Sequence, residues 1–210
     1  MPPANFRLYV VTDRNQTGGR PLVPLIQEAA VAGVPVVQVR ERDLATRELL
    51  SLLGALQTVS RPCRPRLLVN DRVDLALAAG LDGVHLRDTS LPVEVARRLL
   101  GPDQWVAVST HSVDDVRRAA DGGADFVVFG PVYDTSSKRA YGEPQGLRAL
   151  EHAAQAVTLP VFAIGGITVD RVAAVRRAGA HGVAVISAIL SSPDVGAATR
   201  AFLDALARPV

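Results

Sequence analysis

The chain alternates between short apolar runs and longer stretches in which apolar residues recur with helical spacing. Runs that are apolar at nearly every position are typical of parallel strands buried on both faces. Eight such runs occur, at residues 8–12, 36–40, 66–70, 83–86, 105–109, 126–129, 161–165 and 182–185. Helical stretches follow the strands, for example at residues 45–59, 91–100, 113–121 and 169–178. This order predicts eight consecutive strand–helix units.

A weak internal repeat supports this organisation. Four times a helical stretch ends at a glycine that follows Ala or Gly, and a Val-rich strand begins directly afterwards. Glycine fits the position after a helix where φ is positive, so each copy reads as the second half of a βαβ unit. We therefore predict an α/β fold, a single (β/α)8 TIM barrel formed by one domain, residues 1–210.

An open, doubly wound sheet is the main alternative. Such a sheet usually has a glycine-rich nucleotide turn after its first strand. Here the first strand ends in Thr12-Asp13-Arg14-Asn15, which has no such turn. The barrel is therefore the preferred prediction.

Composition excludes several functional classes. Hydrophobic residues make up 48% of the 210 residues and aromatic residues only 4%, so we expect a core of Val, Leu, Ile and Ala. A net charge of +2 is too small to indicate a nucleic-acid partner. No apolar run approaches the ~20 residues of a membrane helix, and residues 1–7 lack an apolar signal core, so a cytoplasmic protein without a membrane partner is expected. The sequence leaves open whether the protein forms a homodimer.

Polar side chains gather where the predicted strands end, which is where barrel enzymes carry their chemistry. Gln38, Arg40 and Arg42 alternate along one strand and therefore share a face. Other candidates at strand ends are Asn70, Asp71, Ser109 and His111. Alternatively, Arg40 is a structural residue that forms an ion pair with Glu41 or Asp43. His111 follows a strand and is a candidate acid–base group, whereas His85 lies within a strand and is expected to be a hydrogen-bonded core residue.

Three loops indicate a phosphate-bearing ligand. The loop after the sixth strand contains Thr135, Ser137 and Lys138, whose hydroxyls and positive charge suit phosphate oxygens. The seventh strand ends in Gly165-Gly166 and the eighth in Ile186-Ser187. Loops after these two strands form the common phosphate site of barrels.

The sequence contains little that indicates a metal site. No histidines are spaced i, i+4 and no Cys-x-x-Cys occurs, because Cys63 is the only cysteine. Asp71 is a candidate ligand for Mg²⁺, although Mg²⁺ usually takes more than one carboxylate in such a site.

Taken in order, the motifs resemble the thiamin phosphate synthase/TenI family. They lie at residues 8–13, 38–42, 70–76, 82–86, 109–112, 130–138 and 163–167. The resemblance implies a (β/α)8 barrel that binds a thiazole ethyl phosphate, with one of two activities. The synthase joins hydroxymethylpyrimidine diphosphate to thiazole phosphate, uses Mg²⁺ and releases pyrophosphate. The TenI branch instead aromatises a carboxythiazole phosphate tautomer by moving a proton, without a metal.

Two departures favour the TenI branch. Synthases resemble one another in Gln-x-Arg-Glu-Lys, and here Arg42 takes the place of the Lys. Synthases also resemble one another in Gly-Gln-x-Asp, and here Ser90 takes the place of the Asp that helps Asp71 to hold Mg²⁺. A neutral hydroxyl cannot replace that charge, although Asp88, two residues earlier, is a possible substitute.

We therefore expect a thiazole tautomerase, an isomerase of thiamin biosynthesis that needs no cofactor. The resemblance implies that His111 moves the proton, that Arg40 binds the substrate carboxylate, and that the heterocycle pocket is lined by Gln38, Arg42, Asn70 and Ser109. The phosphate ligands would be Thr135, Ser137, Lys138, Gly165, Gly166, Ile186 and Ser187. The alternative is a thiamin phosphate synthase, a transferase in which Asp71 holds Mg²⁺. A third possibility is a regulator that binds a phosphate ligand without turnover.

Overall fold

The computed structural model describes residues 4–59, 63–135 and 143–209, and it contains a closed barrel of parallel strands. Each strand pairs with the next, and the last strand pairs with the first. The strands are β1 (Leu8–Val11), β2 (Val36–Val39), β3 (Arg66–Asn70), β4 (Gly83–Leu86), β5 (Trp105–Thr110), β6 (Phe126–Phe129), β7 (Val161–Ile164) and β8 (Gly182–Val185). The predicted TIM-barrel fold is therefore confirmed.

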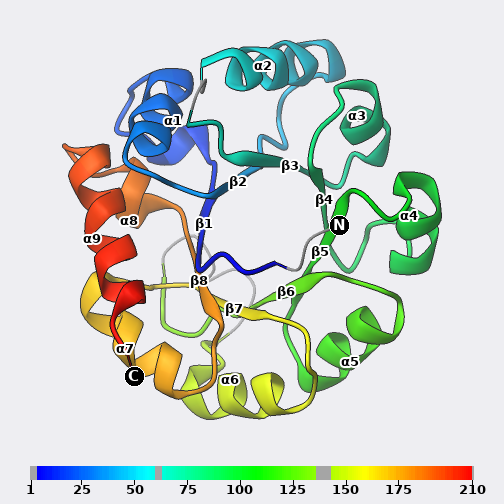
Figure 1. Ribbon diagram of the computed structural model, residues 1–210, viewed down its shortest axis with the longest axis vertical. Helices are drawn as coiled ribbons and strands as arrows, with labels where there is room; N and C mark the ends of the chain where they lie inside the picture. The colour runs from blue at the N-terminus through cyan, green and yellow to red at the C-terminus, as the bar shows by residue number, and fades with distance from the viewer. Residues whose placement is uncertain (1–3, 60–62, 136–142, 210) are drawn as a thin grey trace.

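Helices surround the barrel as an outer layer (Figure 1). They are α1 (Leu22–Val31), α2 (Thr46–Val59), α3 (Val73–Ala78), α4 (Val93–Leu100), α5 (Val113–Asp121), α6 (Gly146–Gln155), α7 (Val172–Arg177), α8 (Ser187–Leu190) and α9 (Val195–Ala207), with short 3-10 turns at Arg14–Gln16 and Val169–Arg171. No helix among the described residues is long and apolar enough to cross a membrane.

Local signals explain where several helices begin and end. Ser112 precedes α5 and its hydroxyl accepts the N–H of Asp115 at 3.1 Å, which satisfies a helix N–H that has no partner within the helix. Asp194 caps α9 in the same way through the N–H of Ala197. The glycines of the internal repeat have positive φ after their helices, as at Gly33 (96°) and Gly179 (89°).

The barrel interior differs from the expected aliphatic core. Val, Leu, Ile and Ala do fill most of the layer between strands and helices. Inside the barrel, however, five aromatic rings pack together: Phe6, Tyr9, Trp105, Phe126 and Phe162. Inward-pointing side chains must fill this volume, and large rings do so with few residues.

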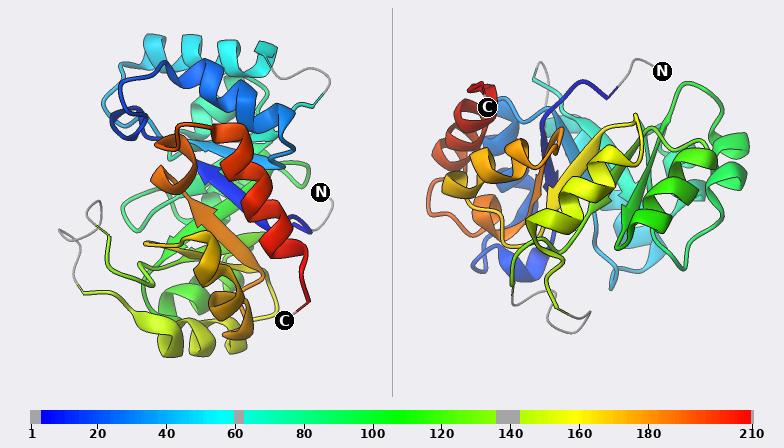
Figure 2. Two further views of the ribbon diagram at one scale, coloured as in Figure 1. Left: turned by 90° about the vertical axis from the view of Figure 1, so that its left-hand side faces the viewer. Right: turned by 90° about the horizontal axis from the view of Figure 1, so that it is seen from below.

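Phe6 closes the amino-terminal end of the barrel. The segment before β1 crosses the barrel opening (Figure 1), and the Phe6 ring stacks on Phe162 with centroids 4.7 Å apart. Figure 2 shows this segment and the described residues that directly follow β6, 130–135, at opposite ends of the barrel. The rings therefore occupy the amino-terminal half of the barrel interior among the described residues.

We expect Phe126→Ala to lower the free energy of unfolding by about 3–5 kcal/mol, because it removes a fully buried ring from the aromatic cluster. Val31→Ala is a matched control, since Val31 is 73% exposed on α1 and should change stability by less than about 0.5 kcal/mol. Urea denaturation measures both. Similar losses in the two variants would contradict the role of the aromatic cluster.

Candidate active site

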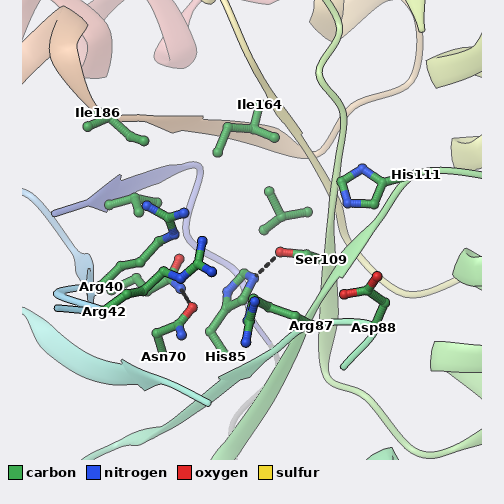
Figure 3. Close-up of a pocket in the computed structure, with 13 residues that line it drawn as sticks. Arg40, Arg42, Asn70, His85, Arg87, Asp88, Ser109, His111, Ile164 and Ile186 are labelled. Atoms are coloured by element: carbon green, nitrogen blue, oxygen red, sulfur yellow. Dashed lines mark hydrogen bonds between the residues drawn. The ribbon is translucent and has the colours of Figure 1, made fainter. Parts of the chain in front are cut away.

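A cavity of about 310 Å³ opens at the carboxyl ends of the strands. All six residues predicted for catalysis or for the heterocycle pocket line it: Gln38, Arg40, Arg42, Asn70, Ser109 and His111. Val11, Val128, Ile164 and Ile186 supply apolar surface to the same cavity. In Figure 3, Arg40 and Arg42 lie on one side, and His111 and Asp88 lie on the other. Strand ends that are distant in sequence therefore meet at one opening.

Hydrogen bonds between neighbouring strands build the polar floor of this cavity. The Gln38 side-chain amide donates to Asn70 Oδ1 at 3.1 Å, from β2 to β3. His85 Nε2 lies 2.8 Å from Ser109 Oγ, and His85 Nδ1 lies 3.1 Å from the Tyr9 hydroxyl. Burial raises the pKa of Tyr9 well above its ordinary value, so this phenol stays neutral. The floor is thus a fixed set of hydrogen-bonding groups.

His85 has a larger place in the cavity than the sequence suggested. It is hydrogen-bonded and only 2% exposed, as expected for a core histidine, yet it also lines the cavity. The strand register pairs it with Asn70, itself a candidate site residue. That register was the missing signal, because a sequence shows the alternation along one strand but not which residues face each other across strands.

Ion pairs hold the segment after β2. Glu41 is 4% exposed; its carboxylate accepts the Thr12 hydroxyl at 2.6 Å and pairs with Arg14 Nε at 3.1 Å. Asp43 also pairs with Arg14, at 2.9 Å. The Arg40 N–H donates to Thr12 Oγ1 at 2.9 Å. The two carboxylates considered as partners of Arg40 therefore form ion pairs with Arg14, while the Arg40 side chain lines the cavity.

His111 is exposed at the rim. Its Nδ1 lies 2.5 Å from the Gly130 carbonyl oxygen, so this nitrogen carries a proton and donates it. Its backbone N–H donates to Asp115 Oδ2 at 3.0 Å. Burial acts to raise the pKa of Asp115, but hydrogen bonds from the His111 N–H and from Ser112 outweigh it and lower that pKa. His111 is therefore anchored at one ring nitrogen.

A second cavity, of about 490 Å³, adjoins the first. Five of the predicted phosphate ligands line it: Thr135, Gly165, Gly166, Ile186 and Ser187. Ser137 and Lys138, the other two, lie outside the described residues. Ile164 and Ile186 line both cavities, so the two spaces share a wall.

The double glycine after β7 has a structural role besides the predicted approach to a ligand. A Cβ at Gly165 would lie 2.6 Å from Pro131 Cβ, and one at Gly166 would lie 2.7 Å from the Asp134 carbonyl oxygen. The Val132 N–H donates to the Ile164 carbonyl at 2.8 Å, continuing the pairing of β6 with β7. These glycines are therefore required first by the close approach of the loop after β6.

Asp71 forms an ion pair with Arg87 and lines a small cavity together with Glu41, whose carboxylate is engaged by Thr12 and Arg14. The φ of Asp71 is +67°, a left-handed conformation that is uncommon outside glycine, and its Oδ2 lies 3.2 Å from Arg87 Nη2. Ser90 Oγ accepts the Arg87 N–H at 2.8 Å. Asp88 lines the first cavity, and its Oδ1 accepts the Thr89 N–H. Among the described residues, no group of three or more His, Cys, Asp or Glu is arranged to hold a metal ion.

Comparison with known proteins identifies the family. Residues 8–189 match the family model described as "Thiamine monophosphate synthase". The chain belongs to this family. It is 47% identical over 203 residues to the "Putative thiamine-phosphate synthase" of Geobacter sulfurreducens, covering 97% of this chain and 95% of the relative. It is 44% identical over 200 residues to the "Thiamine-phosphate synthase" of Roseiflexus sp., covering 95% and 85%.

A solved structure leads to the same family. The "Thiamine phosphate pyrophosphorylase" from Pyrococcus furiosus superposes with a TM-score of 0.86 at 34% identity, covering 96% of each chain. The chain covers 95%, 85% and 96% of the length of these three relatives.

The predicted tautomerase activity is wrong. Relatives that are 38–47% identical are named thiamine-phosphate synthase, a transferase rather than an isomerase. Arg42 does not distinguish the two activities, because an arginine in place of lysine keeps the positive charge. The proton transfer assigned to His111 and the carboxylate binding assigned to Arg40 belonged to that activity and are withdrawn with it.

We expect Asp71→Asn to stay within about 1 kcal/mol of the wild-type free energy of unfolding, because Asn tolerates the left-handed conformation at this position. Asp71→Val should lose about 1–3 kcal/mol, since a β-branched residue is strained there. Urea denaturation compares the two. Equal stability of the Asn and Val variants would show that the backbone conformation at residue 71 is unimportant.

Proposed function

We propose that this protein is a thiamine-phosphate synthase, a transferase that joins hydroxymethylpyrimidine diphosphate to thiazole phosphate and releases pyrophosphate. The single observation that supports it best is the pair of adjoining cavities that share Ile164 and Ile186. A transfer between two substrates requires two sites side by side, whereas an isomerase needs one. Each cavity has the polar groups that one of these substrates requires.

The first cavity suits the pyrimidine diphosphate. Arg40 and Arg42 line it and would bind the diphosphate oxygens, which arginine does with two N–H groups at a time. Gln38 and Asn70 would hydrogen-bond the pyrimidine ring at the floor, next to Ser109. Positive charge that is fixed before the reaction stabilises the pyrophosphate as it leaves.

The second cavity suits the thiazole phosphate. Thr135 offers a hydroxyl, and Ser187 offers a hydroxyl at the first turn of α8, where N–H groups have no acceptor within the helix. Gly165, Gly166 and Ile186 bring backbone to the same space. Ser137 and Lys138 remain proposed phosphate ligands on their sequence position alone.

The transfer itself requires little proton movement. The bond between the pyrimidine methylene carbon and the diphosphate oxygen breaks, and its electron pair leaves with pyrophosphate. The lone pair of the thiazole nitrogen forms the new carbon–nitrogen bond, and that nitrogen becomes positively charged. The protein therefore acts by holding both substrates in line and by neutralising the leaving group. His111 contributes to the wall of the first cavity and is not needed as a base.

The family resemblance implies Mg²⁺, and the described residues do not fit a magnesium site built from two carboxylates. Mg²⁺ binds through one or two carboxylates together with substrate phosphates. The Asp71 carboxylate pairs with Arg87, and the Ser90 hydroxyl accepts the Arg87 N–H. Asp88 is exposed. We therefore assign no step of the transfer to a metal.

The purified protein should form thiamin phosphate and pyrophosphate in equal amounts from hydroxymethylpyrimidine diphosphate and thiazole phosphate, measured by chromatography and by a pyrophosphate assay in the presence of Mg²⁺. Each substrate alone is the control and should give no product. Thermal stabilisation by both substrates without any product would sink the proposal and favour a binding protein.

The two cavities should separate the two substrates kinetically. Arg42→Gln should raise the KM for the pyrimidine diphosphate ~10-fold or more, because it removes a charged hydrogen bond, whereas Arg42→Lys should keep most of the affinity. Ser187→Ala should raise the KM for thiazole phosphate up to ~10-fold. Steady-state kinetics with one substrate varied at a time measures both. If each variant raised the two KM values equally, the assignment of the cavities would be incorrect.

A further inference from the structure

Arg87 is a cationic residue at the junction of two spaces. It lines the first cavity together with Arg40 and Arg42. It also lines a smaller adjoining cavity of about 280 Å³, which contains Asp71 and shares Arg42 and Asn70 with the first. Figure 3 shows Arg40 and Arg42 together on one side of the first cavity, Arg87 next to His85, and Asp88 on the side away from Arg40 and Arg42. A ligand at this junction would contact several arginines.

The Arg87 side chain is held in place but is not saturated. Its backbone N–H donates to Ser90 Oγ at 2.8 Å, and its Nη2 lies 3.2 Å from Asp71 Oδ2. Its Nε is buried and has no hydrogen-bond partner among the described residues, although the side chain as a whole is 28% exposed. A buried donor without an acceptor is unfavourable, and arginine does not lose its proton. Ligand oxygens at the junction would instead contact the exposed part of the Arg87 side chain, which ends in the guanidinium.

The charges of the first cavity favour a polyanion. Three arginines and one aspartate, Asp88, line it. Like charges in a partly enclosed space repel one another, and the repulsion disappears when an anion of several charges binds between them. A diphosphate fits because its two phosphate groups can contact separate arginines.

We propose that Arg87, positioned by Asp71, binds the diphosphate of the first substrate and supplies the positive charge that a metal between two carboxylates would otherwise supply. This inference rests on the proposed synthase function and assigns a new residue to its leaving group. Arg87 contacts the reacting group and is thus a catalytic residue. Asp71 acts through Arg87 and is a positioning residue. Pyrophosphate should therefore bind this protein without a divalent metal.

The direct test is the binding of inorganic pyrophosphate in EDTA at constant ionic strength, measured by titration calorimetry. The wild type should bind, and Arg87→Gln should bind at least ~10-fold more weakly. Arg98→Gln is the matched control, since Arg98 is exposed on α4, directly after the same strand, and should bind as the wild type does. Equal affinity of the Arg87→Gln variant, or binding by the wild type only when Mg²⁺ is added, would overturn the proposal.

Asp71 provides the second readout. Asp71→Asn should lower kcat while pyrophosphate still binds in EDTA, because the guanidinium remains but loses its orientation. If Asp71 had only a structural role, the variant would lose pyrophosphate binding together with kcat. Mn²⁺ alone, followed by its electron paramagnetic resonance signal, distinguishes the metal alternative: Mn²⁺ that binds the wild type and not Asp71→Asn would make Asp71 a metal ligand and overturn the proposal.

A double variant tests the exchange of arginine for metal. Arg87→Gly with Ser90→Asp frees Asp71 and adds a second carboxylate, so pyrophosphate binding should then require Mg²⁺. If the double variant bound pyrophosphate in EDTA as tightly as the wild type does, the inference would be contradicted. Product formation with Mg²⁺ by a wild type that does not bind pyrophosphate in EDTA would reject the role of Arg87 and leave the synthase function intact.

Discussion

The alternation of side chains inside the closed barrel determines the rest of the molecule. Each strand sends every second residue inward, and the rings of the amino-terminal half fill that end completely. The next layer toward the carboxyl ends is polar. Tyr9 belongs to both layers, because its ring packs against Phe126 while its hydroxyl reaches His85. The polar floor is therefore positioned by the aromatic cluster beneath it.

Two carboxylates near the rim arrange the positive charge around this floor. Glu41 engages Thr12 and Arg14 and so fixes the segment that presents Arg40 and Arg42. Asp71 engages Arg87 from the neighbouring strand end. Both carboxylates thus pair with arginine side chains. For Asp71 this differs from the metal binding that the sequence suggested. The left-handed backbone at Asp71 is a further sign that this position is set by function.

The sequence predicted the barrel and most of the cavity, because both follow from patterns along single strands. Apolar runs, repeat glycines and polar strand ends are all local features. His85 and Arg87 were missed as site residues because their importance depends on register and on partners from other strands. The predicted reaction was wrong because it followed from two single positions, Arg42 and Ser90, whereas the charge around the cavity depends on the whole set of arginines.

The wall between the two cavities consists of Ile164 and Ile186, two side chains with no oxygen or nitrogen atom to offer. For the proposed transfer, the electron-poor methylene carbon would thus meet hydrocarbon at the boundary, because these two side chains offer no nucleophile. In this barrel, protection of the diphosphate substrate from hydrolysis would come from apolar surface rather than from any catalytic group.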